Sequence, residues 1–126
     1  MRIGEANIQA MQAMETAMQV SANNVANVNT EGFKAQEVTY ETGPGGTGVR
    51  VGDVVEITTP GPLIRTQDLA DTGDSLGAVR DYVEGSNTDV AREMVTQTVT
   101  EAAYTANATV VRTADDMQGV LLDMLA

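Results

Sequence analysis

The sequence predicts a mainly α-helical fold with a small β insert, in which a long helix at each end of the chain pairs with the other as an α-helical coiled coil. Two observations lead to this fold class. Apolar residues recur at helical spacing in residues 3–28 and again in residues 89–125. Between them the chain is rich in β-branched residues, glycine and proline. At 126 residues we expect one structural unit, divided into residues 1–35, 36–85 and 86–126.

The N-terminal segment carries an apolar stripe with small residues along one edge. The stripe, spaced alternately three and four residues apart, consists of Met11, Met14, Met18, Ser21, Val25 and Val28. The adjoining row consists of Ile3, Ala6, Ala10, Ala13, Ala17 and Val20. A helix over residues 3–28 would be roughly 39 Å long at 1.5 Å per residue.

The middle segment predicts two to four short strands, with one hairpin. "QEVTYE" and "VRVGDVVEITT" are the expected strands, the flexible turn "GPGGTG" separates them, and "PGP" ends the second. We expect an irregular stretch over residues 67–77.

The C-terminal segment has the spacing of a coiled coil over a greater length. Its core positions are Val99, Ala103, Ala106, Val110, Thr113, Met117, Val120 and Met124, with Leu121 alongside. Ser86, Asn87 or Thr88 is the expected N-cap, and Asp89 is favourable near the helix start. A helix over residues 89–125 would be roughly 55 Å long, so the N-terminal helix leaves part of it without a partner.

Composition excludes several classes of function. Eighteen acidic and seven basic residues give a net charge of -11, which disfavours nucleic acid and anionic membranes as partners. The chain has no Cys, His or Trp, so a metal centre or a hydrolase would lack its usual residues, and we expect no cofactor. No apolar run is long enough for membrane insertion, and the N-terminus lacks the apolar core of a cleaved signal peptide.

The junction after the first helix is rich in asparagine. Asn23, Asn24, Asn27 and Asn29 suit a helix end, because asparagine tolerates left-handed backbone angles and bonds nearby main chain, and Gly32 would supply the final bend. That interpretation does not explain why an aromatic residue and the chain's only lysine follow directly.

These residues match a known signature. "ANNVANVNTEGFKA" resembles the N-terminal motif of the bacterial flagellar axial proteins, which include rod, hook and hook-associated subunits. The matching positions are Asn23, Asn24, Asn27, Thr30, Gly32, Phe33 and Lys34. The region from "SNTDVAREM" to "TADDM" is similar to the C-terminal motif of the same family, with matches that include Asn87, Glu93, Met94, Tyr104, Asn107 and Asp115.

The chain departs from the family pattern in two places. Ala102 stands where the family commonly has Arg, and the long insert of distal rod and hook proteins is missing. The size of the chain resembles a short proximal rod subunit, whereas its β segment and the "GF" spelling resemble the distal rod branch.

The resemblance implies a structural, non-enzymatic subunit of the flagellar basal-body rod, located in the part that spans the periplasm. It implies export by the flagellar type III apparatus without a cleaved signal, then polymerisation with copies of the chain and other axial proteins. Met11, Met14 and Met18 would pack against Met117, Val120 and Met124 or their neighbours, within one chain or between copies. The residues expected to form these helix contacts are Met11, Met14, Met18, Val25, Val28, Val99, Ala103, Ala106, Val110, Met117, Val120, Leu121 and Met124.

Two alternatives remain open. A free-standing coiled-coil adaptor, or a diverged paralogue acting outside the flagellum, would share the helical repeats, although a generic coiled coil has no use for the asparagine motif. A dimeric aspartic protease would use Asp71-Thr72-Gly73, but that triplet lies in an expected loop of a largely helical chain rather than in a β-rich cleft.

Overall fold

A computed structural model describes residues 3–65 and 82–125 of the protein. They form two antiparallel helices with two small antiparallel strand pairs between them in sequence. The element order is α1 (Ile3–Ala26), β1 (Gln36–Thr42), a short 3-10 turn (Pro44–Gly46), β2 (Val49–Glu56), β3 (Leu63–Arg65), β4 (Tyr82–Glu84) and α2 (Val90–Leu125). This confirms the predicted fold class. The stretch expected to be irregular, residues 67–77, lies outside the described residues.

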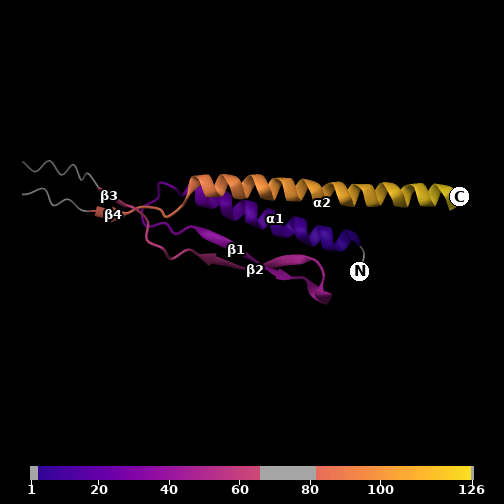
Figure 1. Ribbon diagram of the computed structural model, residues 1–126, viewed down its shortest axis with the longest axis horizontal. Helices are drawn as coiled ribbons and strands as arrows, with labels where there is room; N and C mark the ends of the chain where they lie inside the picture. Colours follow the sequence, from indigo (N-terminus) through magenta and orange to yellow (C-terminus); the bar gives the residue numbers. More distant parts are fainter. Residues whose placement is uncertain (1–2, 66–81, 126) are drawn as a thin grey trace, which may run out of the picture.

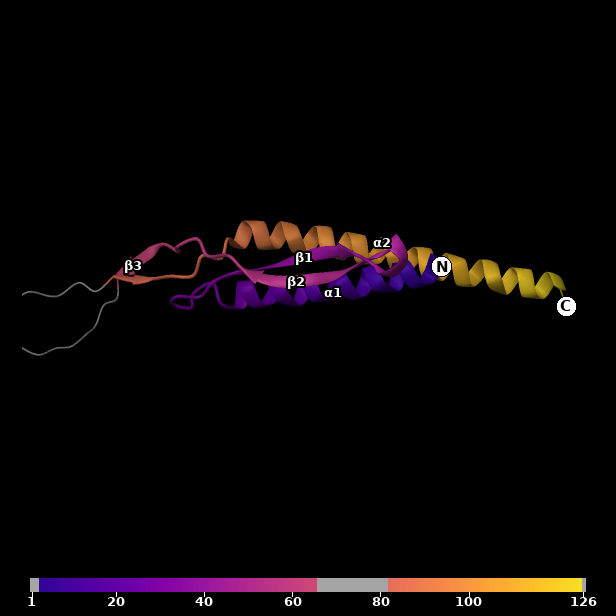
Figure 2. The same ribbon diagram turned by 90° about the horizontal axis from the view of Figure 1, so that it is seen from below.

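The two helices lie side by side and run in opposite directions (Figure 1). Contacts fix this orientation: Ser21 near the end of α1 meets Glu93 near the start of α2, whereas Met14 meets Asn107 further along. The β1–β2 hairpin runs along α1, and the short β3–β4 pair lies at the opposite end of the molecule from the C-terminal end of α2 (Figures 1 and 2). The described part of the chain is therefore elongated, and its two ends differ.

The buried face of α1 is its row of small residues. Ala10, Ala13 and Ala17 are buried, and Ser21 and Asn24 continue the same row. Small side chains let α2 and the hairpin approach the α1 backbone closely: a Cβ added at Gly48, beside β2, would lie 3.5 Å from the Cα of Ala6. The methionine stripe lies at the edge of this contact and is only partly buried.

The first half of α2 has an intramolecular partner and the last turns do not. By a rise of 1.5 Å per residue, α1 is roughly 36 Å long and α2 roughly 54 Å. Met14 and Met18 line a hollow with Thr100 and Tyr104. The expected pairing of Met11, Met14 and Met18 with Met117, Val120 and Met124 is therefore wrong within one chain, because antiparallel packing places the methionines of α1 beside the middle of α2.

Two local details differ from expectation. Asp89 itself caps α2, since its Oδ1 accepts hydrogen bonds from the N–H groups of Ala91 (3.0 Å) and Arg92 (3.3 Å). Ser86 instead bonds Thr88 in the turn before the helix. The described insert contains four strands, within the expected two to four, but they form two antiparallel pairs, β1–β2 and β3–β4, rather than one hairpin.

Candidate functional site

The asparagine motif at the end of α1 and the motif at the start of α2 meet in one hydrogen-bonded junction. Asn24 is 1% exposed and stands at its centre. Its amide Nδ2 donates to the Gln36 carbonyl (2.8 Å) and to Oε1 of Glu93 (2.9 Å), while its Oδ1 accepts from the Gln36 N–H (2.8 Å). One side chain therefore joins α1 to the first residue of β1 and to α2.

Asn87 performs the corresponding role from the other motif. Its Oδ1 accepts from the N–H of Ala35 (2.6 Å), and its Nδ2 donates to the carbonyls of Ile57 (2.7 Å) and Thr59 (2.9 Å). The backbone N–H of Asn87 also donates to the carbonyl of Phe33 (3.3 Å). The segments that enter β1, leave β2 and enter α2 are thus held together by one amide.

Lys34 fixes the base of the second hairpin. Its ammonium donates to the Glu84 carboxylate and to the Thr59 carbonyl (3.3 Å), and the same carboxylate oxygen accepts from the N–H of Gly61 (2.7 Å). The Lys34 ammonium and the Gly61 N–H lower the pKa of Glu84 below its ordinary value. Gly32, with φ of +67°, donates its N–H to the carbonyl of Glu84 (2.7 Å).

The remaining motif asparagines have local partners. Nδ2 of Asn27 donates to the Asn23 carbonyl (2.9 Å), and the Thr30 hydroxyl donates to Oδ1 of Asn27 (3.1 Å). The bend at Gly32 is confirmed, but the expected left-handed asparagines are absent, because every described residue with positive φ is a glycine. The asparagines act through their amide side chains rather than through unusual backbone angles.

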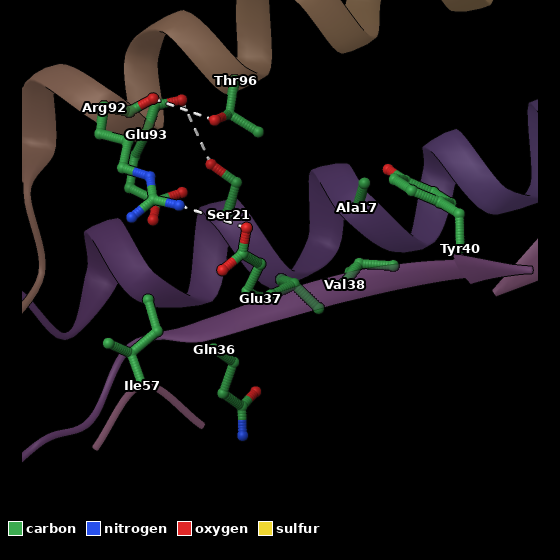
Figure 3. A pocket seen from close by; sticks show the side chains of 11 residues that line it. Ala17, Ser21, Gln36, Glu37, Val38, Tyr40, Ile57, Arg92, Glu93 and Thr96 are labelled. Atoms are coloured by element: carbon green, nitrogen blue, oxygen red, sulfur yellow. Dashed lines mark hydrogen bonds and ion pairs between the residues drawn. The ribbon is translucent and has the colours of Figure 1, made fainter. Parts of the chain in front are cut away.

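Beside Asn24, the contact between α1 and α2 is also polar (Figure 3). The Ser21 hydroxyl donates to the Glu93 carbonyl (3.4 Å). It also accepts from Nε2 of Gln97 (3.2 Å), which the figure does not draw. Arg92 pairs with Glu37 of β1 at 3.2 Å. An open pocket between α1, β1 and α2 is bordered by Ser21, Glu37, Arg92 and Glu93 among others. No cluster of three metal-ligating side chains occurs within residues 3–65 and 82–125.

Other motif residues lie further along α2, beginning directly after Glu93. Met94, Tyr104 and Asp115 are exposed, and Nδ2 of Asn107 donates to the Ala103 carbonyl (2.9 Å) and lies 3.8 Å from the Met14 sulfur. Val25 and Val28 are partly buried near the end of α1. In the half of α2 that α1 accompanies, Ala103 is partly buried, but Val99 is 62% exposed and Ala106 is also exposed, so these two expected core positions are not buried against α1. The triplet Asp71-Thr72-Gly73 lies outside the described residues.

The C-terminal half of α2 presents an exposed apolar surface, and its last turns extend beyond α1. We call this surface the distal α2 face; it consists of Val110, Met117, Val120, Leu121 and Met124, all exposed. Met117 is 58% and Met124 79% exposed. Met117, Val120 and Leu121 also line a shallow hollow together with Thr113 and Asp116. Contiguous exposed apolar surface is typical of interaction sites in proteins.

Sequence reasoning missed part of the junction. The partners supplied by Gln36, Ile57, Thr59, Glu84 and Gln97 were not singled out. Three of them act only through their backbone carbonyls or N–H groups, which carry no sequence signal. Glu84 could have been found from Lys34, the chain's single lysine, because a partly buried ammonium group needs a carboxylate nearby.

Comparison with known protein families gives two matches. The family described as "Flagella basal body rod protein" matches residues 5–34, and the family described as "Flagellar basal body rod FlgEFG protein C-terminal" matches residues 79–124. No curated protein matches the chain. The two matched segments contain α1 with its asparagine-rich turn, and β4 with α2, which are the parts that the junction joins. Neither described helix has the length and apolarity needed to cross a membrane.

Proposed function

Because the chain belongs to the flagellar basal body rod protein family, we propose that it polymerises through its terminal helices, after export by the flagellar type III apparatus, with copies of itself and other axial proteins. Family membership itself assigns a structural role in the flagellar basal-body rod and implies assembly with other axial proteins. The proposal adds the route by which the chain reaches the rod and the surface through which it assembles.

The observation that carries the proposal is the distal α2 face. Roughly 18 Å of α2 extends beyond the length of α1 at 1.5 Å per residue, and its apolar residues are exposed to water. Burying a side chain such as Met117 or Leu121 is worth about 1.5 to 3 kcal/mol, so covering several of them stabilises association substantially. A surface without catalytic or metal-binding groups, but with this much exposed apolar area, suits assembly.

The junction explains how the surface is presented. Asn24 and Asn87 tie the end of α1, both ends of the first hairpin and the start of α2 to one another. The start of α2 is therefore anchored, and the helix extends from a fixed base. We infer that the two family motifs hold α2 in position while its far end makes contacts with neighbouring subunits.

The experiment is to add charge to the distal α2 face. Val110→Asp and Met117→Asp are each expected to abolish incorporation into hook and basal-body particles, because a carboxylate would be buried at the contact. Both side chains are exposed in the monomer, so helix content should stay the same and the unfolding free energy should change by about 0.5 kcal/mol or less.

Gln118→Asp is the matched control, since it adds the same charge one residue away on another side of the same helix. It should be incorporated as the unchanged chain is. Normal incorporation of both Val110→Asp and Met117→Asp would remove the distal α2 face from the account. An adaptor that acts outside the flagellum would instead be absent from the particles in every variant.

A further inference from the structure

The two ends of the molecule carry surfaces of complementary chemistry. At one end lies the hollow of the distal α2 face, formed by Thr113, Asp116, Met117, Val120 and Leu121. At the other end lies the β3–β4 pair (Figures 1 and 2). We propose that the β3–β4 pair of one copy docks in the hollow on α2 of the next copy, as a contact that repeats end to end. The proposal rests on the proposed function and names one of its contacts.

The register of β3 and β4 defines the docking surface. Leu63 pairs with Glu84, Ile64 with Val83, and Arg65 with Tyr82. Since side chains alternate along a strand and paired residues share a face, Leu63, Arg65 and Tyr82 lie on one face of the strand pair. We call these three residues the β3–β4 patch. Leu63 is 71% exposed, and Tyr82 is also exposed.

The opposite face of this strand pair is different. A Cβ added at Gly85 would lie 2.5 Å from Cδ1 of Ile64, so the Ile64 side chain covers the chain just after β4. Ile64 thus has an intramolecular neighbour, whereas Leu63 and Tyr82 point an aliphatic and an aromatic side chain outward. Large apolar side chains of this kind are the anchors that fill hollows at protein interfaces.

Charge favours the β3–β4 patch, rather than a second distal α2 face, as the partner of the hollow. Residues 113–125 contain three acidic residues, Asp115, Asp116 and Asp123, and no basic residue. Two copies of this segment would therefore repel each other if they paired directly. Next to the β3–β4 patch, on the same face, the Glu84 carboxylate is neutralised by Lys34, and Arg65 of the patch has no ion-pair partner among the described residues. The patch thus offers a cation beside apolar side chains, and the hollow offers Asp116 beside apolar side chains.

Geometry makes the contact repeat. The patch and the hollow are different surfaces at opposite ends of the described part of the chain, so one copy cannot join them within itself. A contact between different surfaces of identical subunits is heterologous and propagates, whereas pairing of two identical surfaces stops at a dimer. The chain is therefore built to stack end to end through this pair of surfaces.

Single-cysteine cross-linking tests the contact cleanly, because the chain has no cysteine of its own. Leu63→Cys and Met117→Cys chains are combined in two ways: as purified full-length proteins at increasing concentration, and in basal bodies from cells that produce both chains. In each case a short thiol cross-linker joins cysteines that lie close together. We expect the mixed dimer at least fivefold above the yield from Ile64→Cys mixed with Met117→Cys. Ile64 is the matched control, since it is exposed on the same strand but faces the other way.

The charge step is tested in the same assay. Arg65→Glu in the Leu63→Cys chain should lower the yield about twofold to fivefold, the range for an exposed ion pair, and Asp116→Arg in the Met117→Cys chain should restore it. A structural defect in either chain would not be repaired by changing its partner. Failure of the restored pair to recover would remove Arg65 and Asp116 from the contact.

Other occupants of the hollow give distinct products. A dominant dimer from Met117→Cys alone would mean that two distal α2 faces pair with each other. A dominant product between Ile8→Cys, on the exposed side of α1, and Met117→Cys would mean that α1 of another copy covers the hollow. Either result, or equal yields from the Leu63 and Ile64 chains, overturns the proposal. If the cysteine chains enter basal bodies but give no Leu63–Met117 product, the proposed function stands and only this contact is wrong.

Discussion

Replacing Asn24 by alanine should be among the most destabilising single changes in this protein. Truncation leaves the Gln36 N–H and carbonyl without their amide partner and leaves the Glu93 carboxylate, 8% exposed, without its Asn24 donor. Two neutral hydrogen bonds are worth about 1 kcal/mol each, and one to a charged group about 1.5 to 3 kcal/mol. We therefore expect Asn24→Ala to lower the unfolding free energy by about 3.5 to 5 kcal/mol.

The assay is urea unfolding followed by far-ultraviolet circular dichroism. Asn29→Ala is the matched control: it removes an exposed amide from the same turn and should change stability by about 0.5 kcal/mol or less. Glu93→Gln tests the direction of the bond to α2, because a glutamine oxygen still accepts from Asn24 and the loss should stay near 1 kcal/mol.

Two results would refute this reasoning. If Asn24→Ala and Asn29→Ala had the same small effect, the buried amide would not hold the junction together. If Glu93→Gln were as harmful as Asn24→Ala, the charge of Glu93 rather than its acceptor oxygen would be the important feature.

Two further predictions concern the same junction. Asn87→Ala removes three hydrogen bonds, including the one from the Ala35 N–H, and should lower the unfolding free energy by about 2 to 4 kcal/mol. Hydrogen exchange at the Ala35 amide should become faster relative to amides in the middle of α1, and unchanged exchange there would contradict this prediction. Because the Lys34 ammonium and the Gly61 N–H lower the pKa of Glu84 below 4.5, the stabilisation from Glu84 is present above that pH and lost as pH falls through the lowered value. The difference in urea midpoint between the unchanged chain and Glu84→Gln should therefore shrink between pH 6 and pH 3, and a difference independent of pH would exclude the ionised carboxylate as its source.

Periodicity was sufficient to predict both helices. The alternation of three and four residues predicted helices over residues 3–28 and 89–125, and α1 and α2 span Ile3–Ala26 and Val90–Leu125. Periodicity identified the row of small residues along α1 only as the edge of the methionine stripe and not as the buried face, because Ala10 and Ala17 have less apolar surface than the methionines beside them. They are buried because small side chains permit the closest approach of a neighbouring backbone, which depends on the partner as well as on the helix itself.

The junction was recognisable but its geometry was not predictable. The motif pointed to Asn24 and Asn87 as individual positions. Their partners are mostly backbone groups distant in sequence, and the residue type of such a partner has no influence on the hydrogen bond. The β3–β4 pair is a similar case, since its three-residue strands are too short for an alternating pattern to stand out. Long-range backbone pairing depends on the folded arrangement and is weakly encoded in any local stretch.

The most direct test of the structural role is quantitative mass spectrometry of hook and basal-body particles purified from the source cells, compared with whole-cell and culture-supernatant fractions. The account predicts strong enrichment of this chain in the particles, together with other axial proteins. Absence of the chain from particles of cells that express it and swim would contradict the account.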